Sequence, residues 1–376
     1  MIQRHILELG GRALFAEAQR LIPRGFGVAR RIYREACLEG RFQPETTGIR
    51  PDAVEAWRSA FRFSLPRVVR SVAESSDFGG DTIKTVLATD EGLEFEMVRV
   101  PMGAGKYTLC VSSQVGCRLA CGFCETGRMG LLRNLSTAEI VGQVVLARGL
   151  LGWPIRNIVF MGMGEPLDNA DNVIGALRVL NDPFGLSYGQ QRLTICTVGH
   201  PDGLAKLATL GWKRLDVSIS LNGATDEVRD RVMPINRKVG IRALRDALER
   251  FPRRAKFVYG INYCLMPGIN DRYEDAEAVA SFCRSLRVMV NVIPYNPGTR
   301  PLARAPTEHE VVQFMDWLSA LEIPVTRRVT KGRSVMAGCG QLGNVELRRT
   351  RLPIRDQAGS AGLADPATPG QESDRA

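Results

Sequence analysis

Hydrophobic and polar positions divide the chain into regions with different periods. From residue 1 to about residue 75, apolar residues recur every three or four positions, which predicts amphipathic helices. Between about residues 81 and 101, the segments TIKTVLAT and EFEMVRVP alternate apolar and polar positions, which predicts a β-hairpin. Beyond residue 107, strand-like and helix-like patterns take turns, which predicts parallel strands joined by outer helices.

The region beyond residue 107 contains a regular series of predicted elements. Strands are expected at residues 108–114, 157–162, 192–199, 215–221, 256–266, 288–295 and 324–330. Helices are expected near residues 136–149, 170–181, 202–210, 225–233, 241–250, 273–286 and 308–321. Such alternation fits a doubly wound sheet or a barrel, and the pattern alone does not separate the two.

These patterns predict a domain organisation with a helical accessory domain at the N-terminus. The expected parts are residues 1–75 (helical), 76–107 (hairpin and linker), 108–350 (α/β core) and 351–376 (tail). The tail is rich in Gly, Ala, Pro, Asp and Ser, and it lacks the apolar content needed to fold, so we expect it to be disordered.

Composition narrows the classes of partner. The 376 residues carry a formal net charge of +10, with a pI near 9.4, which suits a polyanion such as RNA but is also found in proteins that bind none. No apolar stretch reaches the roughly 18 residues that span a bilayer, and the N-terminus lacks a signal-peptide core. We therefore expect a cytoplasmic protein without a membrane partner. With only three histidines, imidazole-centred catalysis is a poor hypothesis.

A dense group of cysteines carries the first chemical signal. Cys117, Cys121 and Cys124 form a CxxxCxxC run, and Cys110 lies seven residues upstream. In a reducing compartment such cysteines bind metal or react more often than they form disulfides. Structural zinc usually takes four ligands in paired short spacings. An iron–sulfur cluster held by three thiolates keeps one iron open, where S-adenosylmethionine (SAM) can bind. This spacing, with Phe123 before the last cysteine, is the known radical SAM signature and favours one 4Fe–4S cluster, with zinc as the alternative.

The longer sequence around these cysteines indicates one family within the radical SAM class. VSSQVGC, the CxxxCxxC run, the following TG and Arg133-Asn134-Leu135 resemble the RlmN/Cfr family of radical SAM RNA adenine methyltransferases. The resemblance is close from about Glu96 to about Gly343 and looser in the N-terminal region. It implies a partial (β/α) barrel of the radical SAM type, with the small helical accessory domain engaging RNA.

The resemblance also implies a set of cofactor contacts. GMGEP, with Gly164 and Glu165, is similar to the segment that holds the SAM amino group, although alone it could be a tight turn. Further SAM contacts map onto Cys196, Ser220, Leu221, Asn222 and Asn296. The family commonly has serine in place of Cys196 and histidine in place of Asn222. A thiol is a weaker hydrogen-bond partner than a hydroxyl, so the alternative for Cys196 is a buried strand residue that does not contact SAM.

The family's methyl-carrying cysteine corresponds to Cys339, in Gly338-Cys339-Gly340. By resemblance, a first SAM methylates Cys339, a radical derived from a second SAM activates that methyl group, and the RNA becomes attached to Cys339. Cys110 then attacks the Cys339 sulfur, releasing methylated RNA and leaving a disulfide. The alternative for Cys110 is a strand residue that faces the core. Glu96 resembles a glutamate thought to move a proton on the substrate base, and its alternative is a solvent-side residue.

Basic residues flank Cys339 on both sides. They are Arg327, Arg328, Lys331 and Arg333 before it, and Arg348, Arg349, Arg351 and Arg355 after it. We expect them to position an RNA backbone, the alternative being a solvated charge run.

The resemblance as a whole predicts a monomeric enzyme that methylates an adenine ring carbon, with carbon 2 favoured over carbon 8. The expected substrate is 23S ribosomal RNA, with transfer RNA as a second candidate, and the expected electron donor is a protein such as flavodoxin or ferredoxin. A radical SAM enzyme with another substrate would leave Cys110 and Cys339 unexplained. A non-enzymatic iron–sulfur redox sensor that binds RNA would leave GMGEP unexplained.

Overall fold

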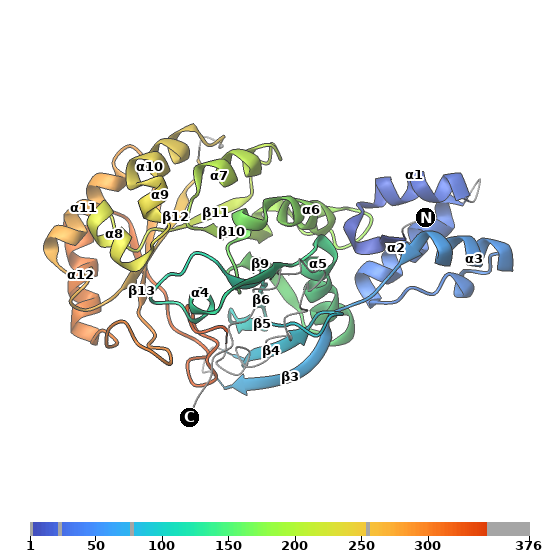
Figure 1. The fold of residues 1–376 in the computed structure, drawn as a ribbon, viewed down its shortest axis with the longest axis horizontal. Coiled ribbons are helices and arrows are strands. Elements are labelled where there is room, and N and C mark those ends of the chain that lie inside the picture. The colour runs from blue at the N-terminus through green and yellow to red at the C-terminus, as the bar shows by residue number, and fades with distance from the viewer. Residues whose placement is uncertain (1–2, 22–24, 76–78, 253–255, 344–376) are drawn as a thin grey trace, which may run out of the picture.

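The computed structural model describes residues 3–21, 25–75, 79–252 and 256–343. Its N-terminal part is helical as predicted, with α1 (Gly11–Leu21), α2 (Phe26–Glu39) and α3 (Pro51–Ala60). Two short strands, β1 (Arg4–His5) and β2 (Phe61–Arg62), pair in parallel and bring the two ends of this part together. Figure 1 shows these helices, in blue, standing to one side of the main sheet.

Among the described residues, one ten-stranded sheet organises the rest of the chain. Its strands are β3 (Arg67–Glu74), β4 (Thr82–Ala88), β5 (Glu94–Pro101), β6 (Tyr107–Cys110), β9 (Ile155–Phe160), β10 (Leu193–Thr197), β11 (Asp216–Ser220), β12 (Tyr259–Leu265), β13 (Val288–Pro294) and β14 (Val325–Arg327). The order across the sheet is β14-β13-β12-β11-β10-β9-β6-β5-β4-β3, with parallel pairing from β6 to β14. Both β5 and β13 line one internal cavity, so the sheet curves around it as in a partial barrel. The predicted fold class is therefore confirmed.

Helices cover the outer face of the parallel strands. They are α5 (Thr137–Val145), α6 (Ala170–Asn181), α7 (Pro201–Ala208), α8 (Asp226–Val232), α9 (Asn236–Val239), α10 (Ile241–Arg250), α11 (Tyr273–Cys283) and α12 (Glu308–Ala320). Except for the short α9, each was expected from the sequence. The predicted capping box is present, because Ser136 accepts a hydrogen bond from the Glu139 backbone while the Glu139 side chain accepts one from the Ser136 backbone.

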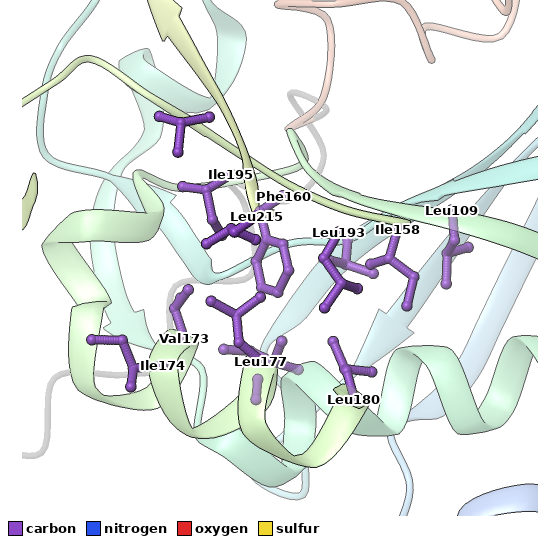
Figure 2. Close-up of a cluster of buried hydrophobic side chains, with 14 of the residues drawn as sticks. Leu109, Ile158, Phe160, Val173, Ile174, Leu177, Leu180, Leu193, Ile195 and Leu215 are labelled. Carbon is purple, nitrogen blue, oxygen red and sulfur yellow. The ribbon is translucent and has the colours of Figure 1, made fainter. Parts of the chain in front are cut away.

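The core between α6 and the sheet forms because apolar residues recur at helical spacing along α6 and at alternate positions along β9 and β10. Figure 2 shows Val173, Leu177 and Leu180 of α6 pointing toward Ile158 of β9 and Leu193 of β10. Each of these five side chains is fully buried, and burying one such side chain stabilises the fold by about 1.5–3 kcal/mol. This packing fixes the positions of the strands, whose carboxyl ends carry the loops of the site.

Two expectations from the sequence are corrected. The helical prediction for residues 1–75 fails at Arg67–Glu74, which forms β3 and pairs antiparallel with β4. Its β-branched residues favour a strand, which extends the predicted hairpin by one strand. Because nearly the whole strand is exposed, its sequence shows no alternation of buried and exposed positions that would have marked it as a strand. The strand predicted at 108–114 ends at Cys110, and Gln114–Cys117 forms β7, which pairs with β8 (Gly130–Asn134) outside the main sheet.

The helical N-terminal part packs directly on the α/β core. The Gly11 backbone N–H donates a 2.6 Å hydrogen bond to Asp182, and the Phe15 and Phe184 rings meet edge to face at 5.1 Å. Cys37 is fully buried beside Gly185, as expected for a small core residue. Of the helices described, none is long and apolar enough to cross a bilayer. The tail predicted at 351–376 lies outside the described residues.

A buried histidine at this junction gives a testable pH dependence. The Nδ1 atom of His5 accepts a 3.1 Å hydrogen bond from the Leu7 backbone, and Nε2 lies 3.1 Å from the Ser64 carbonyl oxygen. Burial, reinforced by the nearby Arg62, lowers the His5 pKa to about 4. Because the unfolded chain binds the proton more readily, the stabilisation is complete above about pH 6.5 and is lost as pH falls toward 4.

We expect the free energy of unfolding to fall by up to about 3 kcal/mol more in the wild type than in His5→Asn between pH 7 and pH 4. Asparagine keeps an acceptor for the Leu7 N–H but does not titrate in this range. Urea unfolding at several pH values measures the difference. His309→Gln, at an exposed position, serves as the control and should follow the wild type. Identical pH slopes in His5→Asn and wild type would contradict the argument.

Candidate active site

The cysteine loop joins β7 to α4 (Glu125–Met129) at one end of the parallel strands. Cys117 ends β7, Cys121 lies in the turn and Cys124 is the N-cap residue of α4. A side chain at Gly127 would come within 2.9 Å of the Cys121 backbone nitrogen, so the TG of the motif lets the loop fold back on itself. The three thiols are thereby gathered on one side of the loop.

These thiols share one buried environment. Burial raises the pKa of Cys117 to about 12 and that of Cys121 well above its usual range, and charge on the neighbouring cysteines raises both further. Burial also raises the pKa of Cys124. Three thiolates so close together require compensating positive charge, which a metal centre would provide. Apolar side chains including Val232, Met233 and Met266 pack around Cys117 and Cys121 and shield them from water.

The number of these thiols bears on the kind of metal centre. Within the described part of the chain, no three His, Cys, Asp or Glu side chains converge closely enough to hold a single ion. Structural zinc usually takes four Cys or His ligands, one more than this loop supplies. A 4Fe–4S cluster held by three thiolates therefore stays the prediction, with zinc as the alternative.

The GMGEP segment lies beside the cysteine loop. Gly164 has φ +97, and a side chain there would come within 2.6 Å of Gln114 Cβ, so glycine is required. The buried Glu165 carboxylate accepts hydrogen bonds from the Thr197 hydroxyl at 2.6 Å and the Val198 backbone at 3.0 Å. Burial raises its pKa to about 7, and its charge in turn raises the pKa of Cys117. Glu165 thus faces the cysteine loop, in a place where a bound cation would favour its ionised form.

The other expected SAM contacts are spread over β10, β11 and the loop after β13. Cys196 accepts a 3.2 Å hydrogen bond from Asn262 and lies 3.5 Å from the Ser220 hydroxyl, and burial raises its pKa to about 11. Leu221 is fully buried, its backbone N–H donates a 3.0 Å hydrogen bond to the Asn262 carbonyl oxygen, and its own carbonyl accepts one from Arg229. The Asn222 side-chain oxygen Oδ1 accepts a 2.9 Å hydrogen bond from the Cys264 backbone, which commits that side chain to joining the loop after β11 to β12.

An internal cavity of about 700 Å³ brings distant residues together. It is lined by Cys110 at the end of β6, by Asn296 after β13, by Cys124 of the cysteine loop and by Cys339 near the C-terminus. Burial raises the pKa of Cys110 to about 12, and the next cause in size is charge on Cys339. Cys110 therefore faces the same space as Cys339 and belongs to the site.

The turn that carries Cys339 is attached to the cysteine loop. Gly340 accepts a 2.8 Å hydrogen bond from the Glu125 backbone, and Leu342 accepts one of 2.7 Å from the Thr126 hydroxyl. Within the turn, the Gln341 side chain accepts a 3.2 Å hydrogen bond from Gly338. Cys339 itself remains exposed at the tip. The first turn of α4 thus holds the Cys339 turn over the cavity.

Two buried charged residues of this region were missed by the sequence analysis. Glu125 accepts hydrogen bonds of 2.8 and 3.0 Å from the backbone and hydroxyl of Thr299, tying α4 to the loop that contains Asn296. Arg229 donates to the carbonyls of Leu221 at 3.1 Å and Val198 at 2.8 Å. Burial lowers the Arg229 pKa to about 10, and its charge lowers that of Cys121. In the sequence, Arg229 lies in a charged segment expected to be helical, and Glu125 directly follows the cysteine motif, where no helix was expected.

Glu96 is internal, so the alternative of a solvent-side residue is wrong. Its carboxylate is fully buried, lies 3.4 Å from Lys84 Nζ and accepts a 2.9 Å hydrogen bond from the Gly343 backbone. Lys84 also lies 3.3 Å from the Met336 carbonyl oxygen. This pair therefore anchors the segment that carries Cys339 at Met336 and Gly343, in addition to the hydrogen bonds from α4. A proton-transfer role for Glu96 stays a prediction.

The basic residues before Cys339 do not form one surface. Arg327 and Arg333 are exposed, and Arg327 makes an ion pair with Glu308 although it also lines the cavity, whereas Arg328 and Lys331 are half-buried. Lys331 donates a 2.6 Å hydrogen bond to the Pro101 carbonyl oxygen. The expected phosphate contacts therefore reduce to Arg327 and Arg333 on this side. Those after Cys339, namely Arg348, Arg349, Arg351 and Arg355, lie outside the described residues.

Comparison with known proteins agrees with this site. Residues 111–283 match the Radical SAM superfamily, and together with the three-thiol loop at the end of a partial barrel they define a radical SAM enzyme. A probable dual-specificity RNA methyltransferase RlmN 1 of Protochlamydia amoebophila is 38% identical over 344 residues, which cover 88% of this chain and 92% of that protein. A dual-specificity RNA methyltransferase RlmN of Rhizorhabdus wittichii is 41% identical over 78% of this chain and 74% of its own length.

A solved structure is similar over nearly the whole chain. The crystal structure of a radical SAM methyltransferase from Sphaerobacter thermophilus superposes with a TM-score of 0.80 at 32% identity, covering 90% of this chain and 99% of that one. The chain therefore belongs to the RlmN/Cfr family of radical SAM RNA methyltransferases.

Proposed function

We propose that this protein methylates an adenine ring carbon in RNA, with Cys339 as the methyl carrier and Cys110 as the thiol that releases the product. The observation that carries the proposal is that both cysteines line one cavity, beside Cys124 of the cysteine loop. A single catalytic thiol would need no second cysteine there. We favour carbon 2 over carbon 8 and 23S ribosomal RNA over transfer RNA, and both RNAs are compatible with the dual specificity named for the relatives.

The residues that would hold the cofactors surround this cavity. Cys117, Cys121 and Cys124 would bind a 4Fe–4S cluster, which three thiols in an apolar shell suit well. SAM would lie against GMGEP, Cys196, Ser220 to Asn222 and Asn296. Once bound and reduced by a donor such as flavodoxin or ferredoxin, these groups supply a 5′-deoxyadenosyl radical.

The chain's own residues would then divide the remaining chemistry. An adenine ring carbon such as carbon 2 is electrophilic, so it cannot attack a sulfonium methyl group directly. The Cys339 thiolate can do so, and its exposed position at the tip of a turn allows it to reach both SAM and the base. Cys110 lies deeper in the cavity and would attack the Cys339 sulfur only after the RNA is attached.

The cavity also limits how the RNA can bind. A volume of about 700 Å³ accepts a nucleobase together with part of a cofactor but excludes a helical stem. The target adenine must therefore leave its stack, as bases do in other enzymes that modify them. We place the phosphate backbone near the exposed Arg327 and Arg333, and we expect the protein to act as a monomer in the cytoplasm.

Mass spectrometry tests this proposal directly. Anaerobically reconstituted protein incubated with SAM is expected to gain one methyl group on the peptide containing Cys339 and none on that containing Cys283, which lies in α11. Nucleoside analysis of 23S ribosomal and transfer RNA, from cells with and without the gene, is expected to reveal a methyladenosine that depends on it. Protein that never acquires a methyl group on Cys339 would overturn the carrier role.

A further inference from the structure

Arg328 lies in the segment between β14 and the Cys339 turn and faces the interior. Its backbone N–H donates a 2.9 Å hydrogen bond to the Val292 carbonyl oxygen of β13, and its guanidinium lies 3.4 Å from the Met161 sulfur. It lines the same cavity as Cys110 and Cys339. The side chain therefore has both its position and its direction fixed by neighbouring strands.

Arg328 differs from its neighbour in what balances its charge. Arg327 pairs with Glu308, whereas among the ion pairs of the described residues none includes Arg328. An internal guanidinium without an anion is costly. Asp216 lines the cavity as well, but it begins β11 at the opposite end of the strands. The groups that can become anionic near Arg328 are three thiols, namely Cys339, Cys110 and Cys196.

The pKa shifts of Arg328 and of the nearby thiols agree with a favourable interaction between them. Charge on Cys339, then on Cys110 and Cys196, raises the pKa of Arg328. In return, Arg328 lowers the pKa of Cys110 and of Cys196, although burial dominates and keeps both above their usual value. Another cation that lines the cavity, Lys331, is turned toward Pro101, and burial lowers its pKa. Arg328 is thus the cation placed to interact with these thiols.

We infer that Arg328 is a positioning residue that stabilises first the thiolate of Cys339 and then the thiolate of Cys110. This inference rests on the proposed function, because it assigns one guanidinium to its two thiol steps. Arginine suits the task better than lysine, since it keeps its charge when desolvated.

The sequence of charges explains how one cation can serve both cysteines. Cys339 loses its proton to water in the cavity and takes the methyl group of SAM, whose sulfur keeps the electron pair of the broken bond. As a thioether, Cys339 is neutral, so Arg328 is left facing Cys110. Once the radical steps of the proposed function have joined Cys339 to the RNA through a methylene group, Cys110 loses its proton to water and forms a bond to the Cys339 sulfur. The electron pair of the broken carbon–sulfur bond stays on the methylene carbon, which takes up a proton and becomes the methyl group of the RNA.

The test measures thiol reactivity, which does not depend on turnover. In the reconstituted full-length protein, iodoacetamide alkylation of Cys110 and Cys339 is followed by peptide mass spectrometry between pH 6 and pH 10. In Arg328→Met we expect alkylation of both cysteines at pH 7.5 to slow by about tenfold or more. Arg328→Lys should retain most of the wild-type rate. Arg304→Met, the matched control at an exposed arginine that pairs with Glu310 away from the cavity, should leave both rates unchanged.

Other outcomes separate this inference from its alternatives. Unchanged alkylation rates in a folded Arg328→Met would overturn it and leave Arg328 as a support for Met161 and β13 only. If Arg328→Met does not fold, Arg328→Gln is compared with Arg328→Lys, and equal alkylation rates in this pair would also overturn it. Failure of wild-type Cys339 to acquire a methyl group would instead overturn the proposed function, since alkylation reports on Arg328 whether or not methyl transfer occurs.

Discussion

Replacing Cys110 by alanine is expected to leave RNA covalently attached to Cys339. The variant keeps the methyl carrier and all three thiols of the cysteine loop, so every step up to attachment can proceed. Without the thiol at the end of β6, the carbon–sulfur bond to Cys339 has no attacking group. Multiple-turnover methylation should fall by roughly a thousandfold. Denaturing gels of protein with radiolabelled RNA would show the adduct as a slowly migrating band.

Two further variants decide what such a band means. In the double variant Cys110→Ala, Cys339→Ala the band should disappear, because the attachment point is gone. Cys283→Ala, in the packed face of α11, should turn over normally without an adduct. Normal product release by Cys110→Ala would remove the resolving role and leave Cys110 as a packing residue.

Substituting Cys124 by alanine is expected to abolish cluster binding and RNA methylation together. Losing one of three thiolates should weaken cluster retention by more than about a hundredfold, since even changes to residues behind a metal ligand cost ten- to a hundredfold. Iron analysis and the visible absorption of the anaerobically reconstituted protein measure the loss. Cys110→Ala should retain full iron content, which separates the ligands from the fourth cysteine nearby. Full iron content in Cys124→Ala would show that the cluster is held elsewhere.

Much of the fold could be predicted because its elements are long and strongly periodic. The series from β9 to α12 was placed to within a few residues, since parallel strands buried on both faces and amphipathic helices leave clear patterns. Strand β3 was missed because an exposed edge strand has no buried face to mark it. The β7–β8 hairpin was missed because its strands are short and its shape depends on Gly116, where a side chain would collide with the Gly130 carbonyl oxygen.

The candidate site divides in a similar way. Spacing was enough to single out the cysteine loop, whereas GMGEP and Cys339 were singled out by resemblance to the family, and their roles stay predictions. The inward direction of Arg328 and the burial of Arg229 could not be predicted, since arginines in charged segments usually face solvent. The position of Arg328 depends on Val292 and that of Arg229 on Val198, and both partners lie far away in sequence and are brought close by the fold.

The two hydrogen bonds between the first turn of α4 and the Cys339 turn couple the order of the cysteine loop to that of the Cys339 turn, although the two segments are distant in sequence. Coupling of this kind is reciprocal: whatever rigidifies one segment favours order in the other. Filling the cysteine loop with iron would then also favour the poised position of Cys339, and a chain without iron would hold its methyl-accepting thiol less firmly. The architecture therefore works as a quality check on maturation, because an enzyme that lacks its cluster is also less ready to consume SAM in a methylation that it cannot complete.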